Sequence, residues 1–133
     1  MKDWLVGAVV STLAVFAPIK AVILVTGLLI FFDLITGIWA AKKKGQQITS
    51  AGLRRTVTKC FVYNAAILLG FLAETYMLDG FLPISKICSG LIAVVEMASL
   101  LENLNTINGS PIFKSLIDKL GSINDNIEPP KAE

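Results

Sequence analysis

Residues 20–41 read KAVILVTGLLIFFDLITGIWAA, and this stretch determines the class of the protein. Between its ends it carries a single charged side chain, Asp33. At about 1.5 Å per residue, a helix of this length measures about 33 Å, which matches the hydrocarbon core of a bilayer at about 30 Å. The stretch therefore predicts a transmembrane helix that holds one carboxyl group inside the membrane.

Two further apolar runs of similar length follow in the chain. They cover residues 57–78 and 82–104, and Asp79-Gly80 between them predicts a turn. An earlier run, residues 4–16, gives only about 20 Å of helix, so it either crosses with help or lies at the membrane interface. The predicted fold class is an all-α integral membrane protein, a bundle of three to four transmembrane helices with a C-terminal cytoplasmic amphipathic helix.

The composition is typical of a chain that lipid covers over much of its surface. Of the 133 residues, 54% are hydrophobic and 17% are charged, and the mean hydropathy is +0.69. The chain has no histidine, and Cys60 and Cys88 lie inside apolar runs without forming a CxxC pair. It also has no HExxH motif, no glycine-rich phosphate loop and no histidine partner for a nucleophile. We therefore expect no enzyme activity, no cofactor, no metal and no nucleic-acid partner.

A basic segment joins residues 20–41 to the run at 57–78. It contains six basic and no acidic side chains, namely Lys42, Lys43, Lys44, Arg54, Arg55 and Lys59. Short loops rich in lysine and arginine stay in the cytoplasm. These residues are therefore predicted to set the topology, with the C-terminus cytoplasmic, and to contact anionic lipid head groups. The N-terminus is cytoplasmic too if residues 4–16 cross the membrane, and external if they lie flat.

The residues after the last apolar run predict a short cytoplasmic helix. Residues 105–109 are expected to form a loop, with Ser110 and Pro111 as the N-cap and first residue of the helix. Helical spacing gives it an apolar and a polar face, suited to the inner leaflet or to the bundle surface. The apolar face comprises Ile112, Phe113, Leu116, Ile117 and Leu120, and the polar face Lys114, Ser115, Asp118 and Lys119. The predicted segments are a transmembrane domain at 1–104, the loop and helix at 105–121, and a flexible tail at 122–133.

Ionisable side chains inside the apolar runs need partners, water or a function, because each costs about 2.5–3.5 kcal/mol at the bilayer centre. Counting from the expected cytoplasmic ends puts Asp33 and Glu96 at similar depth, with Asn64 nearby. These three residues predict an intramembrane polar layer with three interpretations: contacts within one chain, contacts between chains, or the lining of an aqueous path. Near the outer face, Glu74 and Lys86 lie level and predict an ion pair, unless each reaches water separately.

Two sequence elements lie on either side of this layer. Asp33, Thr36 and Gly37 precede the lysine run, and Glu96, Ser99, Glu102 and Asn103 end the last apolar run. In order and spacing they resemble the elements of the toxin-secretion and phage-lysis holin family, phage holin family 4, from about residue 20 to about residue 121. The resemblance implies a homo-oligomer in the bacterial inner membrane that makes lesions and so releases a cell-wall-degrading endolysin or a toxin.

Three other functions are compatible with the same residues. An antiholin would have the same build. In a small ion-conducting subunit, Asp33 and Glu96 would form the ion site, and neutralising either acid would stop conduction without changing assembly. A membrane scaffold would tolerate those changes and fail when Phe113 or Leu116 is made polar.

Overall fold

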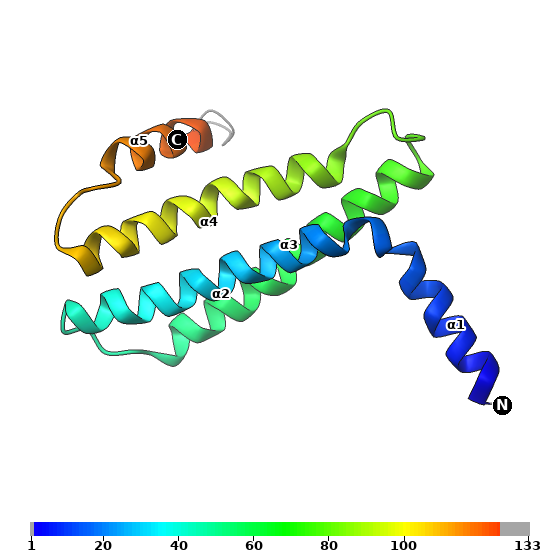
Figure 1. Ribbon diagram of the computed structural model, residues 1–133, viewed down its shortest axis with the longest axis horizontal. Coiled ribbons are helices and arrows are strands. Elements are labelled where there is room, and N and C mark those ends of the chain that lie inside the picture. Colours follow the sequence, from blue (N-terminus) through cyan, green and yellow to red (C-terminus); the bar gives the residue numbers. More distant parts are fainter. Residues whose placement is uncertain (1, 126–133) are drawn as a thin grey trace, which may run out of the picture.

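The computed structural model describes residues 2–125 of the chain. Its elements are α1 (Lys2–Val15), the 3-10 helix η1 (Ala17–Ile19), α2 (Lys20–Lys43), α3 (Ser50–Tyr76), α4 (Ile84–Asn108) and α5 (Lys114–Asp125) (Figure 1). No strand occurs in residues 2–125, so the prediction of an all-α protein is confirmed.

Three helical segments are long and apolar enough to cross a membrane: η1 with α2, then α3, then α4. They lie side by side, with α3 running opposite to α2 and α4 (Figure 1). We call the end where α2 and α4 finish and α3 starts the basic end, and the other end, which contains Pro83, the Pro83 end. Of the three to four predicted spans, the described residues contain three, because α1 has only 14 residues, or about 21 Å of helix.

α3 begins at Ser50, seven residues before the predicted run at 57–78. The Thr49 side chain accepts a hydrogen bond from the Gly52 N–H at 3.4 Å, which caps the helix and satisfies one of its free backbone donors. Arginine and lysine are good helix formers, so the basic residues do not prevent the helix from starting early. As a result, Lys59 lies in the third turn of α3 and not beside a loop.

The connection between α4 and α5 also differs from the prediction. α4 continues through Asn108, across the predicted loop, and ends at Gly109, whose φ of +75° is the left-handed conformation of a helix C-cap. α5 begins at Lys114 and not at Pro111, because the Phe113 N–H donates to the Asn105 side chain at 3.0 Å and this contact fixes an irregular turn.

α5 runs back along α4, so it packs on the bundle, one of the two places expected for it (Figure 1). The helix also includes residues 122–125, the start of the predicted tail. The remainder of that tail lies outside the described residues.

The apolar core lies toward the Pro83 end. Ile19, Ile67, Phe71 and Ile92 are buried there, and the Phe16 ring packs against Phe71 with 6.4 Å between the ring centroids. The outer faces of the spans expose large apolar side chains, as expected of surfaces that lipid covers.

A glycine brings α3 and α4 together near the same end. A Cβ atom on Gly70 would lie 3.1 Å from the Ile84 side chain and 3.4 Å from the Ser85 backbone nitrogen. Small residues of this kind let helix backbones approach closely in a membrane. Only glycine fits this contact without a shift of the neighbouring helix.

Candidate functional site

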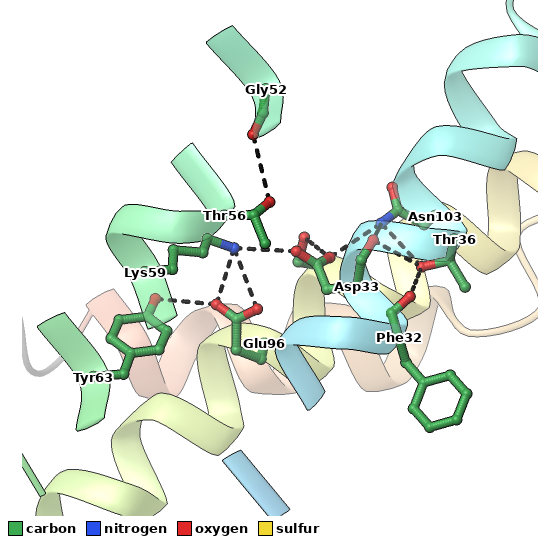
Figure 2. Close-up of polar contacts among 10 residues, drawn as sticks. Phe32, Asp33, Thr36, Gly52, Thr56, Lys59, Tyr63, Glu96 and Asn103 are labelled. Atoms are coloured by element: carbon green, nitrogen blue, oxygen red, sulfur yellow. Dashed lines mark hydrogen bonds and ion pairs between the residues drawn. The ribbon is translucent and has the colours of Figure 1, made fainter. Parts of the chain in front are cut away.

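An ammonium group joins the three long helices in the basic half of the bundle. The Lys59 Nζ on α3 lies 3.1 Å from Asp33 Oδ2 on α2, and 2.9 and 3.2 Å from the two carboxylate oxygens of Glu96 on α4. Figure 2 shows Lys59 between the two acids. One side chain therefore holds two carboxyl groups from different helices.

Glu96 is the most enclosed member of this group. Its side chain has no exposed surface, whereas Lys59 is 18% exposed and Asp33 15%. The Tyr63 hydroxyl donates to Glu96 Oε1 at 3.0 Å. Since a buried carboxylate is tolerated only with a cation and further hydrogen bonds, Lys59 and Tyr63 together account for the presence of Glu96 in the interior.

The Asp33 carboxylate has a second set of partners on α4. The Ser99 hydroxyl donates to Asp33 Oδ1 at 2.6 Å, and the Asn103 amide donates to the same oxygen at 3.1 Å. Asn103 also donates to Thr36 Oγ1 at 3.3 Å, while the Thr36 hydroxyl is bonded to its own helix (Figure 2). We call Asp33, Lys59, Tyr63, Glu96, Ser99 and Asn103 the polar cluster.

Helical spacing explains how the sequence assembles the cluster. Glu96, Ser99 and Asn103 follow one another at three and four residues, which places them on one face of α4. Lys59 and Tyr63 are four residues apart and share a face of α3 by the same rule.

A glycine on α2 gives Asn103 access to Asp33. A Cβ atom on Gly37 would lie 3.5 Å from the Asn103 amide nitrogen, which is ordinary van der Waals contact. Any larger side chain at this position would compete with Asn103 for the same space.

A groove of about 300 Å³ opens onto the cluster from the basic end. It runs between α2 and α3, and its walls include Asp33, Lys59 and Asn103 together with Arg55 and Thr56. The cluster holds two carboxyl groups for one ammonium group, so with every group ionised it carries one excess negative charge. The groove offers a route by which water or a polar partner reaches that charge.

The structure brings two of the three predicted layer residues together. Asp33 and Glu96 both bind Lys59, whereas Asn64 does not join them. The Asn64 amide donates to the Cys60 carbonyl of its own helix at 2.7 Å, and its Oδ1 is buried with no hydrogen-bond partner in the described residues. Five residues from Lys59, Asn64 is rotated by about 140° around α3, which points it away from the acids.

Glu74 and Lys86 do not form the predicted ion pair within residues 2–125. Glu74 Oε2 instead accepts hydrogen bonds from the Ser85 hydroxyl at 2.7 Å and from the Ser85 N–H at 3.2 Å. These two donors lie at the start of α4, where backbone N–H groups are free to bond outside the helix. Glu74 therefore joins α3 to α4 through Ser85.

The basic residues have more than one environment. Lys59, for which lipid contact is predicted, is turned into the bundle, and this corrects its role. Lys43 Nζ donates to the Ile107 carbonyl near the end of α4. The remaining predicted topology residues are exposed at the basic end, namely Lys42, Lys44, Arg54 and Arg55.

Sequence reasoning did not identify the central position of Lys59 or the presence of Tyr63. The four-residue spacing of these two side chains on an apolar helix was the available signal. Glu102, which belongs to the second sequence element, is exposed and lies outside the cluster. Within residues 2–125, no three or more His, Cys, Asp and Glu side chains form a group that could hold a metal ion.

Comparison with known proteins gives one match. A family model described as the bacteriophage holin family matches residues 10–125. No curated protein and no solved structure matches the chain. The matched range contains the three long helices, α5 and every residue of the polar cluster, so it covers the fold and the site together.

Proposed function

The chain belongs to the bacteriophage holin family, and on this premise we propose that it oligomerises in the bacterial inner membrane and permeabilises it, so that an endolysin or a toxin leaves the cytoplasm. The protein is a multi-pass membrane protein with three candidate spans. Its proposed partners are membrane lipid, further copies of itself and an endolysin. This function makes and breaks no covalent bond.

The polar cluster is the observation that carries the proposal. Each ionisable group inside a span costs about 2.5–3.5 kcal/mol, and an apolar core would join the same helices without this cost. A charged contact has a property that an apolar contact lacks, because water or polar groups of another chain can replace its partners. We therefore infer that the cluster holds the helices together in one chain and can exchange partners during assembly.

The orientation follows from the basic segment. Its exposed lysine and arginine side chains lie at one end of the bundle, and such segments are retained in the cytoplasm. We therefore place the basic end, α5 and the C-terminus in the cytoplasm and the Pro83 end outside. The groove beside Asp33 then opens toward the cytoplasm.

Induced expression in bacteria tests the function. The chain is expressed with and without a cytoplasmic endolysin that lacks an export signal, while membrane potential, viability and turbidity are followed. We expect an abrupt loss of potential in both cultures, and lysis only in the culture with the endolysin. Undisturbed growth and potential, despite confirmed membrane insertion, would contradict the holin proposal and favour an antiholin or a scaffold.

A pair of matched variants connects this assay to the cluster. Asp33→Asn removes the carboxylate in excess of the single ammonium group and leaves Lys59 paired with Glu96. We expect the packed bundle to become more stable and lysis to be delayed. Asp79→Asn makes the same chemical change in an exposed turn and should leave the time of lysis unchanged.

A small ion-conducting subunit is the second candidate, favoured by the groove that reaches Asp33. This function predicts a steady conductance in liposomes without release of a large enzyme. Asp33→Asn would abolish that conductance while the oligomeric state stays the same. Release of a co-encapsulated endolysin-sized protein from the liposomes would exclude it.

A further inference from the structure

We propose that α1 of one copy packs into the groove between α2 and α4 of a second copy. This inference deepens the proposed function, because it rests on the assembly of several chains and names the surface that joins them. It uses two features that the polar cluster leaves unexplained: an exposed apolar helix and an open apolar groove.

α1 is apolar on every side and has no partner beyond the 3-10 turn. None of its residues is buried, and Trp4 and Leu13 are 66% and 65% exposed. Figure 1 shows it leaving the bundle at the Pro83 end. Its apolar side chains are distributed around the helix and form no single stripe. A helix that is hydrophobic all round is normally covered by other parts of a protein or by lipid.

Two simpler locations for α1 do not fit its sequence. Its 14 residues give about 21 Å of helix, too short for a hydrocarbon core of about 30 Å. A helix that lies flat in the interface needs a polar face, and α1 has charged side chains only at Lys2 and Asp3. An apolar surface of protein, at the level where α1 leaves the bundle, satisfies both constraints.

The groove between α2 and α4 offers such a surface in the Pro83 half of the bundle. It has a volume of about 370 Å³, and its walls are Ala21, Val22, Val25, Thr26, Leu29, Lys86, Ser89, Gly90 and Ala93. A Cβ atom on Gly90 would meet nothing within 4 Å. The Ser89 hydroxyl already donates to the Lys86 carbonyl at 3.0 Å, so it needs no polar partner from an occupant.

The two surfaces correspond in shape and charge. α1 carries Gly7 with open space around it, so its backbone can approach Gly90 closely. Asp3 precedes Gly7 by four residues, as Lys86 precedes Gly90. A crossing at the two glycines with the helices in the same sense therefore brings Asp3 level with Lys86 and pairs opposite charges.

Each copy presents both the helix and the groove, on different surfaces. Such a contact is heterologous, so it propagates from copy to copy and closes into a ring or extends as a chain. This geometry provides the assembly that the proposed function requires, without using the polar cluster.

Cysteine cross-linking in membranes tests the contact. Two differently tagged chains are co-expressed, both with Cys60→Ser and Cys88→Ser, one carrying Gly7→Cys and the other Gly90→Cys. A short bismaleimide should give a product that carries both tags. The control pair, Gly7→Cys with Leu69→Cys on the exposed face of α3, should give at least tenfold less product.

Reversal of the charges adds a second readout. Asp3→Lys should lower the cross-linked yield several-fold, and Lys86→Asp in the partner chain should restore it. Equal yields for the Gly90 and Leu69 pairs would overturn the inference. So would a link found only within one chain, when Gly7→Cys and Gly90→Cys are placed in the same polypeptide.

The lysis assay separates this inference from the proposed function. If lysis occurs without the Gly7–Gly90 product, the function stands and the interface is wrong. If the product forms without lysis, the interface stands and the holin proposal is wrong.

Discussion

In the Pro83 half of the bundle the helices meet through close apolar packing, whereas in the basic half they meet through charged and polar side chains. Gly70 lets α3 approach Ile84 closely, beside the buried side chains of Ile67 and Phe71. In the basic half, the corresponding α3–α4 contact is the pairing of Lys59 with Glu96. The same pair of helices is therefore joined by two kinds of interaction.

The two kinds of contact respond differently to their surroundings. Close packing depends on shape and is lost only when the backbones separate. A charged contact depends on its counter-charge, and water or another chain can supply a replacement. We therefore expect the basic half to be the part that rearranges when copies assemble, and the Pro83 half to keep the helices aligned.

The largest expected effect comes from Lys59→Met. The variant leaves Glu96 buried without its cation, and removal of one partner of a buried ion pair costs about 3–5 kcal/mol. The free energy of unfolding, measured by SDS titration in mixed micelles with circular dichroism, should fall by this amount. Arg54→Met removes an exposed charge on the same helix and should change it by less than about 0.5 kcal/mol.

A compensated variant determines whether charge is the cause. Adding Glu96→Gln and Asp33→Asn to Lys59→Met removes both carboxylates that have lost their cation. Much of the lost stability should return, because neutral groups have a smaller desolvation penalty. If the triple variant is as unstable as Lys59→Met, lost packing of the lysine side chain and not its charge explains the defect.

The next effect concerns packing in the Pro83 half. In Gly70→Leu, the new side chain has no room against Ile84, and overpacking of this kind costs about 2–3 kcal/mol. Gly27→Leu makes the same change on α2, where a Cβ atom meets nothing within 4 Å, and should be almost neutral. Similar losses in the two variants, measured by the same titration, would show that helix propensity and not the close approach decides the result.

Hydropathy and spacing predicted the spans because those signals are local to each helix. Residues 20–41 fall within α2, and the runs at 57–78 and 82–104 correspond to α3 and α4. The boundaries were less accurate, since Thr49 and Gly109 end helices through single contacts and backbone angles that hydropathy does not reflect.

The partners within the cluster required information that depth alone does not provide. Counting residues placed Asp33, Asn64 and Glu96 in one layer, but the rotation of each side chain around its helix decides which of them meet. Lys59 was assigned to the membrane surface because α3 was predicted to start later than it does. The spacing of Lys59 and Tyr63 would have placed both on one face.

A smaller effect is expected from Ser99→Ala in the basic half. The variant removes the 2.6 Å hydrogen bond to Asp33 and leaves the bond from Asn103. Hydrogen bonds between helices in membranes contribute about 0.6–1.7 kcal/mol, and a charged acceptor puts this one near the upper limit. If the titration shows no loss for Ser99→Ala but a clear loss for Asn103→Ala, the amide alone would hold Asp33.

The smallest effect is expected from Ser85→Ala, which makes the same change at a carboxylate in the Pro83 half. The Ser85 hydroxyl donates to Glu74 at 2.7 Å, almost the distance between Ser99 and Asp33, so contact length alone predicts equal losses. Two differences argue against equality. The Ser85 N–H still binds Glu74 in the variant, and Glu74 lies near the end of α3, where water can replace the hydroxyl. Ser85→Ala should therefore be less destabilising than Ser99→Ala in the same titration. A loss equal to or larger than that of Ser99→Ala would mean that the Pro83 half also depends on a polar contact, and the division between the two halves would have to be abandoned.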